Sequence, residues 1–202
     1  LKYNEGPWLL AAGVTGGLGW YDGTRAVSFG GFSTTATSDY DQSFLVGRLT
    51  GAYLMSFGHL YLKPEVSAAA TYLKRDAYRE RAAGGAALAV DASDDTVLSV
   101  SPILELGTEV AFASGAVARP FIRGGFTWRD TDTFTARARF ADAGPGAAPF
   151  TVVTRIDDVV AEVGAGFDLV TSGDTALRIG YEGQFGDTTT QHTGSAKLSV
   201  RF

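Results

Sequence analysis

Apolar and polar residues alternate along much of this chain, most clearly towards the C-terminus. In segment 194–202, every second residue from Ala196 to Phe202 is apolar, and the residues between them are serine or charged. Segments 177–185 and 161–169 repeat the pattern. Because the side chains of an extended strand point alternately to opposite faces, this period of two predicts β-strands with one apolar and one polar face.

The same alternation extends towards the N-terminus. It is clear in four further segments and weaker in two more, which gives about nine strands. Most are longer than the ~5–6 residues usual in globular sheets, and they approach the ~9–11 residues of a strand that crosses a bilayer at a tilt. The four clear segments are 8–20, 60–71, 98–112 and 122–129, and the weaker ones are 25–38 and 42–56.

The connections between these segments differ in length. Long stretches near 76–93 and 135–150 separate short turns, and we expect the long stretches to face outward and to be the most mobile part. Short turns at one end and long loops at the other are typical of outer-membrane barrels. The short turns are expected at 21–24, 56–59, 113–116 and 172–174.

The pattern therefore predicts an all-β fold, an antiparallel transmembrane β-barrel. Aromatic residues near the expected strand ends would form an interfacial girdle. A soluble β-sandwich is the alternative, but polar faces rich in Gly, Ser and Thr, long strands and the lack of a covering helix pattern favour the barrel. The girdle residues are Trp8, Trp20, Tyr21, Phe112, Trp128 and Phe202.

Charged residues recur on the polar faces. Because an Arg or Lys facing lipid at mid-membrane costs about 2–4 kcal/mol, these residues are predicted to face an enclosed lumen. Two interpretations stay open: a network of mutual ion pairs that stiffens the wall, or a polar track for an extended polypeptide or a plug helix. The predicted lumen-facing residues are Lys63, Glu65, Glu105, Glu109, Arg123, Glu162, Asp168, Arg178, Glu182, Lys197 and Arg201.

Composition narrows the chemistry. The mean hydropathy of +0.05 decides nothing, because outward apolar and inward polar residues average out. The chain has no Cys, which excludes disulfides and thiolate metal sites, and a net charge of −5 without a basic cluster makes nucleic acid an unexpected partner. No metal or other cofactor is expected. The N-terminus lacks a basic segment followed by an apolar stretch, so no signal peptide is expected within this sequence.

A catalytic site is not expected either. His192, with Ser195 and Asp187, is the one arrangement that suggests a hydrolase, but the histidine falls in a polar turn predicted at 187–191. The second histidine, His59, lies in a short turn. We therefore interpret both as solvated turn residues and the protein as no enzyme.

Several fragments, in order, resemble the autotransporter β-domain family over nearly the whole chain. They are Tyr21-Asp22 followed by Arg25-Ala26-Val27, then Leu60-Tyr61-Leu62-Lys63-Pro64, Leu88-Ala89-Val90-Asp91 after Tyr78-Arg79-Glu80, Arg119-Pro120-Phe121, Gly180-Tyr181-Glu182-Gly183-Gln184-Phe185-Gly186-Asp187, and His192-Thr193-Gly194 before Val200-Arg201-Phe202.

The resemblance implies a twelve-strand barrel in a Gram-negative outer membrane, with its C-terminus in the periplasm. It implies that a helix threading the lumen links the barrel to an N-terminal passenger, and that Phe202 is part of a signal read by the barrel-assembly machinery. Residues 1–202 would then be one barrel domain, and the first strands, the linker helix and the passenger would lie outside this sequence. The expected partners are outer-membrane lipid, the passenger with its linker helix, and the assembly machinery.

Two other functions remain alternatives. A small porin or adhesin-like barrel would pass solutes or present its loops without exporting a passenger. A barrel-embedded hydrolase would lose activity when Ser195 or His192 is replaced by Ala.

Overall fold

The computed structural model describes residues 1–81, 85–144, 146–171 and 175–200, and the described chain forms antiparallel β-sheets without a helix. Among these residues no helix has the length and apolar character needed to cross a bilayer. Nine strands form the main sheet, in the order β1 (Lys2–Glu5), β2 (Trp8–Phe29), β3 (Phe32–Tyr53), β5 (Leu60–Arg75), β8 (Ser93–Thr108), β10 (Val117–Arg129), β13 (Val159–Val170), β14 (Thr175–Phe185) and β15 (Thr190–Val200).

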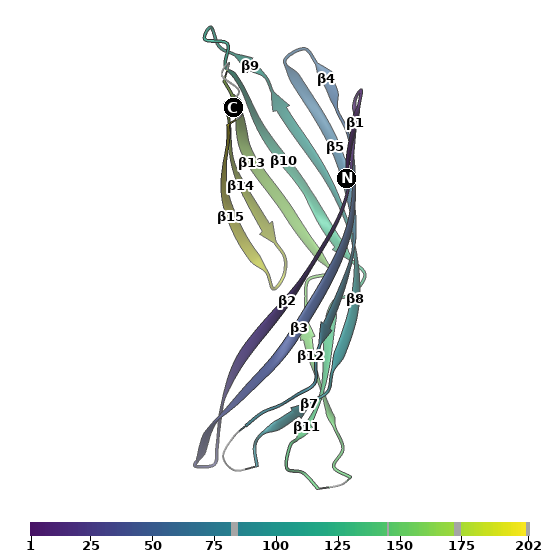
Figure 1. The fold of residues 1–202 in the computed structure, drawn as a ribbon, viewed down its shortest axis with the longest axis vertical. Helices are drawn as coiled ribbons and strands as arrows, with labels where there is room; N and C mark the ends of the chain where they lie inside the picture. Colours follow the sequence, from purple (N-terminus) through teal and green to yellow (C-terminus); the bar gives the residue numbers. More distant parts are fainter. Residues whose placement is uncertain (82–84, 145, 172–174, 201–202) are drawn as a thin grey trace.

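Two short strands extend this sheet at one end: β4 (Met55–Phe57) pairs with β5, and β9 (Val110–Ala111) pairs with β10. Figure 1 shows the sheet curling so that β15 and β2 stand on opposite sides of a hollow. Within the described residues β1 and β15 form no ladder with each other, so the curl is open along that seam. The all-β antiparallel fold is confirmed. The number of strands on this path equals the expected nine, but the strands differ, because β1 was not predicted and the segments predicted at 8–20, 25–38 and 42–56 fall mostly within β2 and β3.

The two ends of the curled sheet differ, and we name them by their connections. The turn end carries the tight connections around Gly6, Gly58 and Gly115, each with a positive φ. The loop end carries the β2–β3 and β14–β15 hairpins and the two long connections, 76–92 and 130–158. The predicted arrangement, with the short turns at 56–59 and 113–116 at one end and the long connections at the other, is therefore correct; the turn predicted at 172–174 lies outside the described residues.

One predicted turn is wrong. The chain does not turn at 21–24, because β2 continues through Asp22 and Gly23, which pair with Asp39 and Ser38 of β3. It turns instead at Gly30–Gly31, whose φ values of 51° and 82° favour glycine. Trp20 and Tyr21 consequently lie inside a strand rather than at its end, and the weak segment predicted at 25–38 spans two strands.

The two long connections contain a second sheet, which the sequence patterns did not predict. Its order is β12 (Phe150–Arg155), β11 (Thr133–Phe140), β7 (Leu88–Val90), β6 (Tyr78–Arg79). A bridge between Thr37 and Arg81 ties it to β3, beyond the part of β3 that pairs with β5. Stretches expected to be irregular loops are therefore partly ordered as strands at the loop end (Figure 1).

Apolar burial is scarce and concentrated away from the middle of the main sheet. The buried apolar residues are alanines and valines, and five of them lie at the loop end: Ala36, Ala86, Ala87, Val90 and Ala138. Large apolar side chains on the main sheet are exposed instead. A soluble domain of this size would bury such residues in its core, so this sheet is built to meet an apolar surrounding.

Candidate functional site

The register of the main sheet separates its residues into two faces. Leu62 lies opposite Leu106, and Leu106 lies opposite Ile122, so apolar residues form continuous rows across neighbouring strands. The intervening positions form polar rows, such as Lys63, Glu105 and Arg123. Residues directly opposite in a ladder share a face, so the faces are apolar and polar over the whole sheet.

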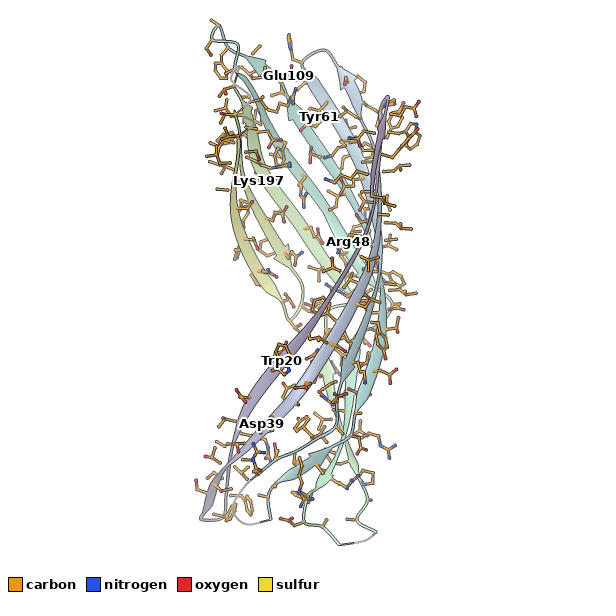
Figure 2. All side chains as sticks on the ribbon, viewed as in Figure 1. Trp20, Asp39, Arg48, Tyr61, Glu109 and Lys197 are labelled. Atoms are coloured by element: carbon orange, nitrogen blue, oxygen red, sulfur yellow. The ribbon has the colours of Figure 1, made fainter. Side chains whose placement is uncertain are left out.

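The polar face is the enclosed one. On it, Glu105 is 6% exposed and Thr127 is 8% exposed, whereas Leu49, Ile122 and Val14 on the apolar face are 65%, 59% and 75% exposed. Curling crowds the side chains of the concave side and spreads those of the convex side. We therefore name the polar, concave side the inner face and the apolar, convex side the outer face; Figure 2 shows the side chains along both.

A first charged row crosses the inner face from the end of β8 to β15. Arg119 donates from Nε to Glu109 Oε2 at 2.8 Å, and two strands further on Arg178 Nε lies 3.2 Å from Asp168 Oδ1. Lys197 lies directly opposite Arg178. Signs alternate from Glu109 through Arg119 and Asp168 to Arg178, which is the arrangement that stabilises cross-strand neighbours; the alternation ends at Lys197, which has the same sign as Arg178.

A second row begins at β5. Lys63 Nζ donates to Glu105 Oε2 at 3.0 Å, and the Tyr61 hydroxyl donates to Glu105 Oε1 at the same distance. Further along the sheet, Arg123 of β10 reaches across Gly164 of β13 and lies 2.9 Å from Glu182 of β14. The buried Glu105 carboxylate is thus paired and hydrogen-bonded on both oxygens, which is what a carboxylate in a confined wall requires.

The remaining predicted residues lie nearby on the same face. Glu162 accepts a hydrogen bond of 2.5 Å from the Thr127 hydroxyl, which is also 2.6 Å from Ser101 Oγ. Glu65 lies 4.0 Å from Lys63. The register thus brings ten of the eleven predicted residues onto one face, most of them in pairs; Arg201, like Phe202, lies outside the described residues.

Comparison with known proteins fits this geometry. A model of the autotransporter β-domain family matches residues 1–198. The chain belongs to the autotransporter β-domain family. Its fold is similar to that of the crystal structure of the β-domain of the Bordetella autotransporter BrkA, with a TM-score of 0.63 at 23% identity, over 100% of this chain and 70% of that one. A comparison with curated protein sequences finds no match.

Membership gives this autotransporter β-domain its general role. It is an outer-membrane β-barrel that acts as the translocator of a passenger. The apolar outer face is then the surface that meets lipid. Among the described residues, no three His, Cys, Asp or Glu side chains gather as a metal site would require.

Several inner-face cations of this autotransporter β-domain, Arg119 and Arg48 among them, were not in the predicted set. Arg119, the partner of Glu109, lies on the same face as Arg123. Pro120 interrupts the alternation, so the predicted segment begins only at residue 122 and leaves Arg119 out. Arg48 lies in the weak segment 42–56, where Phe44 and Val46 occupy the polar face and obscure the alternation. Assigning every second residue of each full-length strand to the polar face would have placed both arginines there.

The histidine that suggested a hydrolase lies elsewhere than predicted. His192 is inside β15 rather than in a turn, and its Nδ1 is 2.7 Å from the Tyr181 hydroxyl. Ser195 is three residues further along the same strand, so its side chain points to the opposite face. An imidazole and a hydroxyl separated by the sheet cannot exchange a proton directly, so the imagined triad is not formed.

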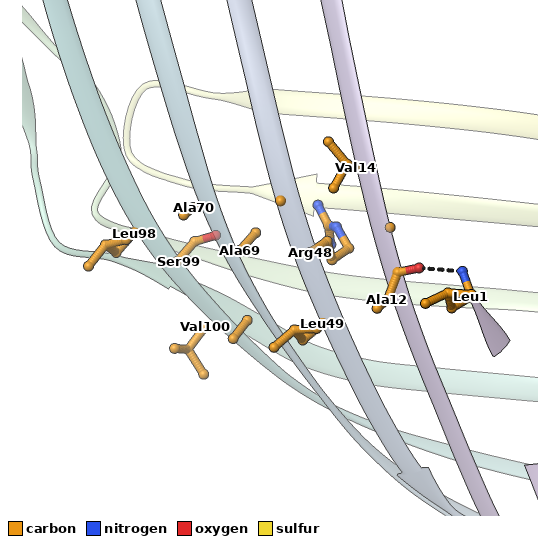
Figure 3. A pocket seen from close by; sticks show the side chains of 13 residues that line it. Leu1, Ala12, Val14, Arg48, Leu49, Ala69, Ala70, Leu98, Ser99 and Val100 are labelled. Carbon is orange, nitrogen blue, oxygen red and sulfur yellow. Dashed lines mark hydrogen bonds between the residues drawn. The ribbon is translucent and has the colours of Figure 1, made fainter. Parts of the chain in front are cut away.

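A broad cavity of about 870 Å³ lies against β2, β3, β5 and β8 (Figure 3). Small residues such as Ala12, Gly47 and Ala68 form its floor, and Leu49 and Val100 lie among them. Most of its lining belongs to the outer face and carries no charge. In an autotransporter β-domain this part of the wall is a shallow apolar depression on the outer face, suited to contact with lipid chains.

Proposed function

We propose that the inner face lines a closed lumen and that the segment joining passenger to barrel, a linker helix, lies in it. The observation that carries this proposal is the separation of the faces. Exposed apolar side chains such as Ile122 cover the convex side, while charges that would each cost about 2–4 kcal/mol in lipid are gathered and paired on the concave side.

Closure of the barrel is part of the same proposal. In hydrocarbon each unpaired backbone N–H or C=O costs several kcal/mol, so the free edges of β2 and β15 need partners. We propose that strands preceding residue 1 supply them and complete a barrel of twelve, with the linker helix and passenger further upstream. Residues 1–202 are then the larger part of one barrel domain.

Orientation follows from the two ends. We propose that the turn end, with the C-terminus, lies in the periplasm and that the loop end, with the second sheet, lies at the cell surface. The C-terminal segment of the sequence, with Phe202 as its last residue, would then present the signal for the barrel-assembly machinery. The separation of His192 from Ser195 supports a translocator that performs no catalysis itself.

The experiment is export of a passenger by the full-length polypeptide in a Gram-negative host. We expect the passenger to become accessible to protease on intact cells, and a protease tag placed at Gly30–Gly31 to be cut from outside while one placed at Gly58 is protected. A passenger retained in the periplasm would contradict the translocator. Export with the opposite accessibility would contradict only the orientation.

A porin is the second candidate, and conductance separates it. If the full-length protein forms an open, ion-conducting pore in planar bilayers and exports nothing, the porin interpretation replaces the proposal. We expect instead that the full-length protein conducts far less than the same barrel without its upstream segment, because the linker helix occupies the lumen.

A further inference from the structure

Arg48 differs from the paired cations of the inner face. Its side chain is exposed on the concave side of β3, and among the described residues it forms neither an ion pair nor a hydrogen bond. Lys63, Arg119, Arg123 and Arg178, in contrast, each have a carboxylate within 4.0 Å. A guanidinium carries five N–H donors, so Arg48 has unused capacity for a bidentate partner.

The wall around Arg48 cannot provide that partner. Both neighbouring strands are present: Arg48 lies opposite Gly13 of β2 on one side and Ala69 of β5 on the other. The nearest positions on the same face are all uncharged: Ala11, Thr15, Val46, Thr50, Ser67 and Thr71. An acidic partner must therefore come from the hollow itself.

The same neighbours leave room for an occupant. A cavity of about 490 Å³ lies over Arg48. It is lined by the small or uncharged residues Ala11, Gly13, Thr15, Val46 and Thr50 and, from β1, by a second cation, Lys2. A Cβ added at Gly13 would meet nothing within 4 Å. The charged rows, with their long side chains, run from Lys63 across β8 to β14, so the part of the inner face around Arg48 is shallower, and a polypeptide backbone can approach it closely.

We propose that Arg48 binds a carboxylate, Asp or Glu, on the segment of the same polypeptide that lies in the lumen, and that the small residues around Arg48 form its seat. This inference rests on the proposed translocator function. It adds the position of the luminal segment relative to the wall, because one acidic side chain of that segment lies against β3. Displacing water between segment and wall strengthens the attraction within the pair, and the bidentate geometry of the guanidinium offsets the cost of desolvating both charges.

Cross-linking in the full-length protein tests the contact directly. Residues 1–202 contain no Cys, so Ala69→Cys beside Arg48 adds the one thiol of this part of the barrel; any cysteine elsewhere in the full-length protein is first replaced by Ser. Paired with single cysteines along the upstream luminal segment, it should form a disulfide at positions next to one Asp or Glu and at few others. Gly124→Cys, on the outer face, is the matched control and should cross-link to none of them.

Charge variants test the chemistry. Relative to the wild type, Arg48→Glu should reduce the cross-link and the amount of exported passenger several-fold, and Arg48→Gln less. Changing the cross-linked acidic residue to Arg should restore export in the Arg48→Glu protein. Arg155→Glu, an exposed position on β12, is the charge-matched control and should export normally. Retention of heat-modifiable mobility on gels shows that each variant barrel has folded.

The outcomes separate the two proposals. If the wild type exports its passenger but no acidic residue cross-links at Ala69→Cys, or Arg48→Glu exports normally, the Arg48 contact is wrong and the translocator stands. If the wild type exports nothing, the translocator fails first. If Arg48→Glu changes only the anion selectivity of an open pore, Arg48 binds dissolved anions rather than a carboxylate of the luminal segment, and the inference is overturned. Should Arg48→Glu not fold, Arg48→Gln provides the cross-linking measurement.

Discussion

Arg25 and Glu80 join the two sheets through a two-pronged ion pair. Arg25 donates from Nε to Glu80 Oε1 at 2.9 Å and from a terminal nitrogen to Oε2 at 2.5 Å, and the Leu88 N–H donates to the same Oε2 at 2.8 Å. Arg25 also donates to the Ala86 carbonyl. The long strand β2 thereby holds the connection 76–92 on its inner face.

Glu80→Gln should loosen the second sheet without unfolding the barrel. Glu80 is 8% exposed, but Arg25 is 41% exposed, so screening reduces the loss to about 1–2 kcal/mol. Exchange of the Leu88 amide hydrogen should accelerate roughly 5- to 30-fold. Asp142→Asn is the control, because its partner Arg79 is 61% exposed, and it should change exchange very little. Equal effects of the two variants would contradict this role for Glu80.

Acid should loosen the same contact. The hydrogen bond from Arg25 lowers the pKa of Glu80 below its ordinary 4.5; burial opposes this, and the Leu88 N–H adds to the lowering. The same hydrogen bond raises the pKa of Arg25, which stays charged throughout. A lowered carboxyl pKa contributes stability that is complete above 4.5 and is lost as pH falls through the folded value.

Protease accessibility of the 76–92 connection should therefore be constant from neutral pH to about 4.5 and rise below it. Cleavage on reconstituted barrels, measured with an acid-active protease, checks this. In Glu80→Gln the accessibility should be high at neutral pH and lose this acid dependence. A rise centred near pH 7 would mean that a different group controls the contact.

How far the sequence predicts this structure depends on what fixes each part. On the main sheet, alternation alone places Leu104 outward and Glu105 inward, because a strand with lipid on one side and a polar hollow on the other must alternate. At the loop end the strands do not lie between lipid on one side and a polar hollow on the other, so their residues need not alternate. The strands Tyr78–Arg79 and Leu88–Val90 are short and are held by contacts with β2 and β3, distant in sequence, which no local pattern records.

The false turn at 21–24 has a similar cause. Asp22-Gly23 is a strong local turn signal, yet both residues pair with β3, because the hairpin continues well beyond the segment that faces β5. Arg48 escaped notice for a related reason: the apolar Phe44 and Val46 share its face. Predicting an ion pair such as Arg123 with Glu182 requires knowing which residues of different strands lie opposite each other. The alternation within one strand does not give this register.

Replacing Gly125 by Ala should destabilise the barrel, whereas replacing its neighbour Gly124 by Ala should leave the stability almost unchanged. A Cβ at Gly125 would lie 2.2 Å from the Pro102 carbonyl oxygen and 2.9 Å from Ile103 Cα, both backbone atoms that cannot move aside. At Gly124 the nearest atom, the Glu162 carbonyl oxygen, would be 3.9 Å away. Gly125→Ala should cost about 1–3 kcal/mol, and Gly124→Ala almost nothing.

Denaturant unfolding of the two alanine variants in detergent or lipid, followed by tryptophan fluorescence, measures this difference. The unfolding midpoint should fall for Gly125→Ala and stay near the wild-type value for Gly124→Ala. Equal midpoints would mean that β8 and β10 can separate at this point without loss, which contradicts the close approach at Pro102.

Val14 and Thr15 provide the sharpest test of which face meets lipid. They are adjacent on β2 and both exposed, but Val14 lies on the outer face opposite Gly47, and Thr15 on the inner face opposite Val46. An Arg at Val14 would meet hydrocarbon near mid-membrane and should cost about 2–4 kcal/mol, whereas an Arg at Thr15 enters the polar hollow and should cost less than about 1 kcal/mol. Folding titrations into lipid vesicles measure both values. Because the substituted residue is the same and the positions are neighbours, a larger loss for Thr15→Arg could arise only if the faces were assigned the wrong way round.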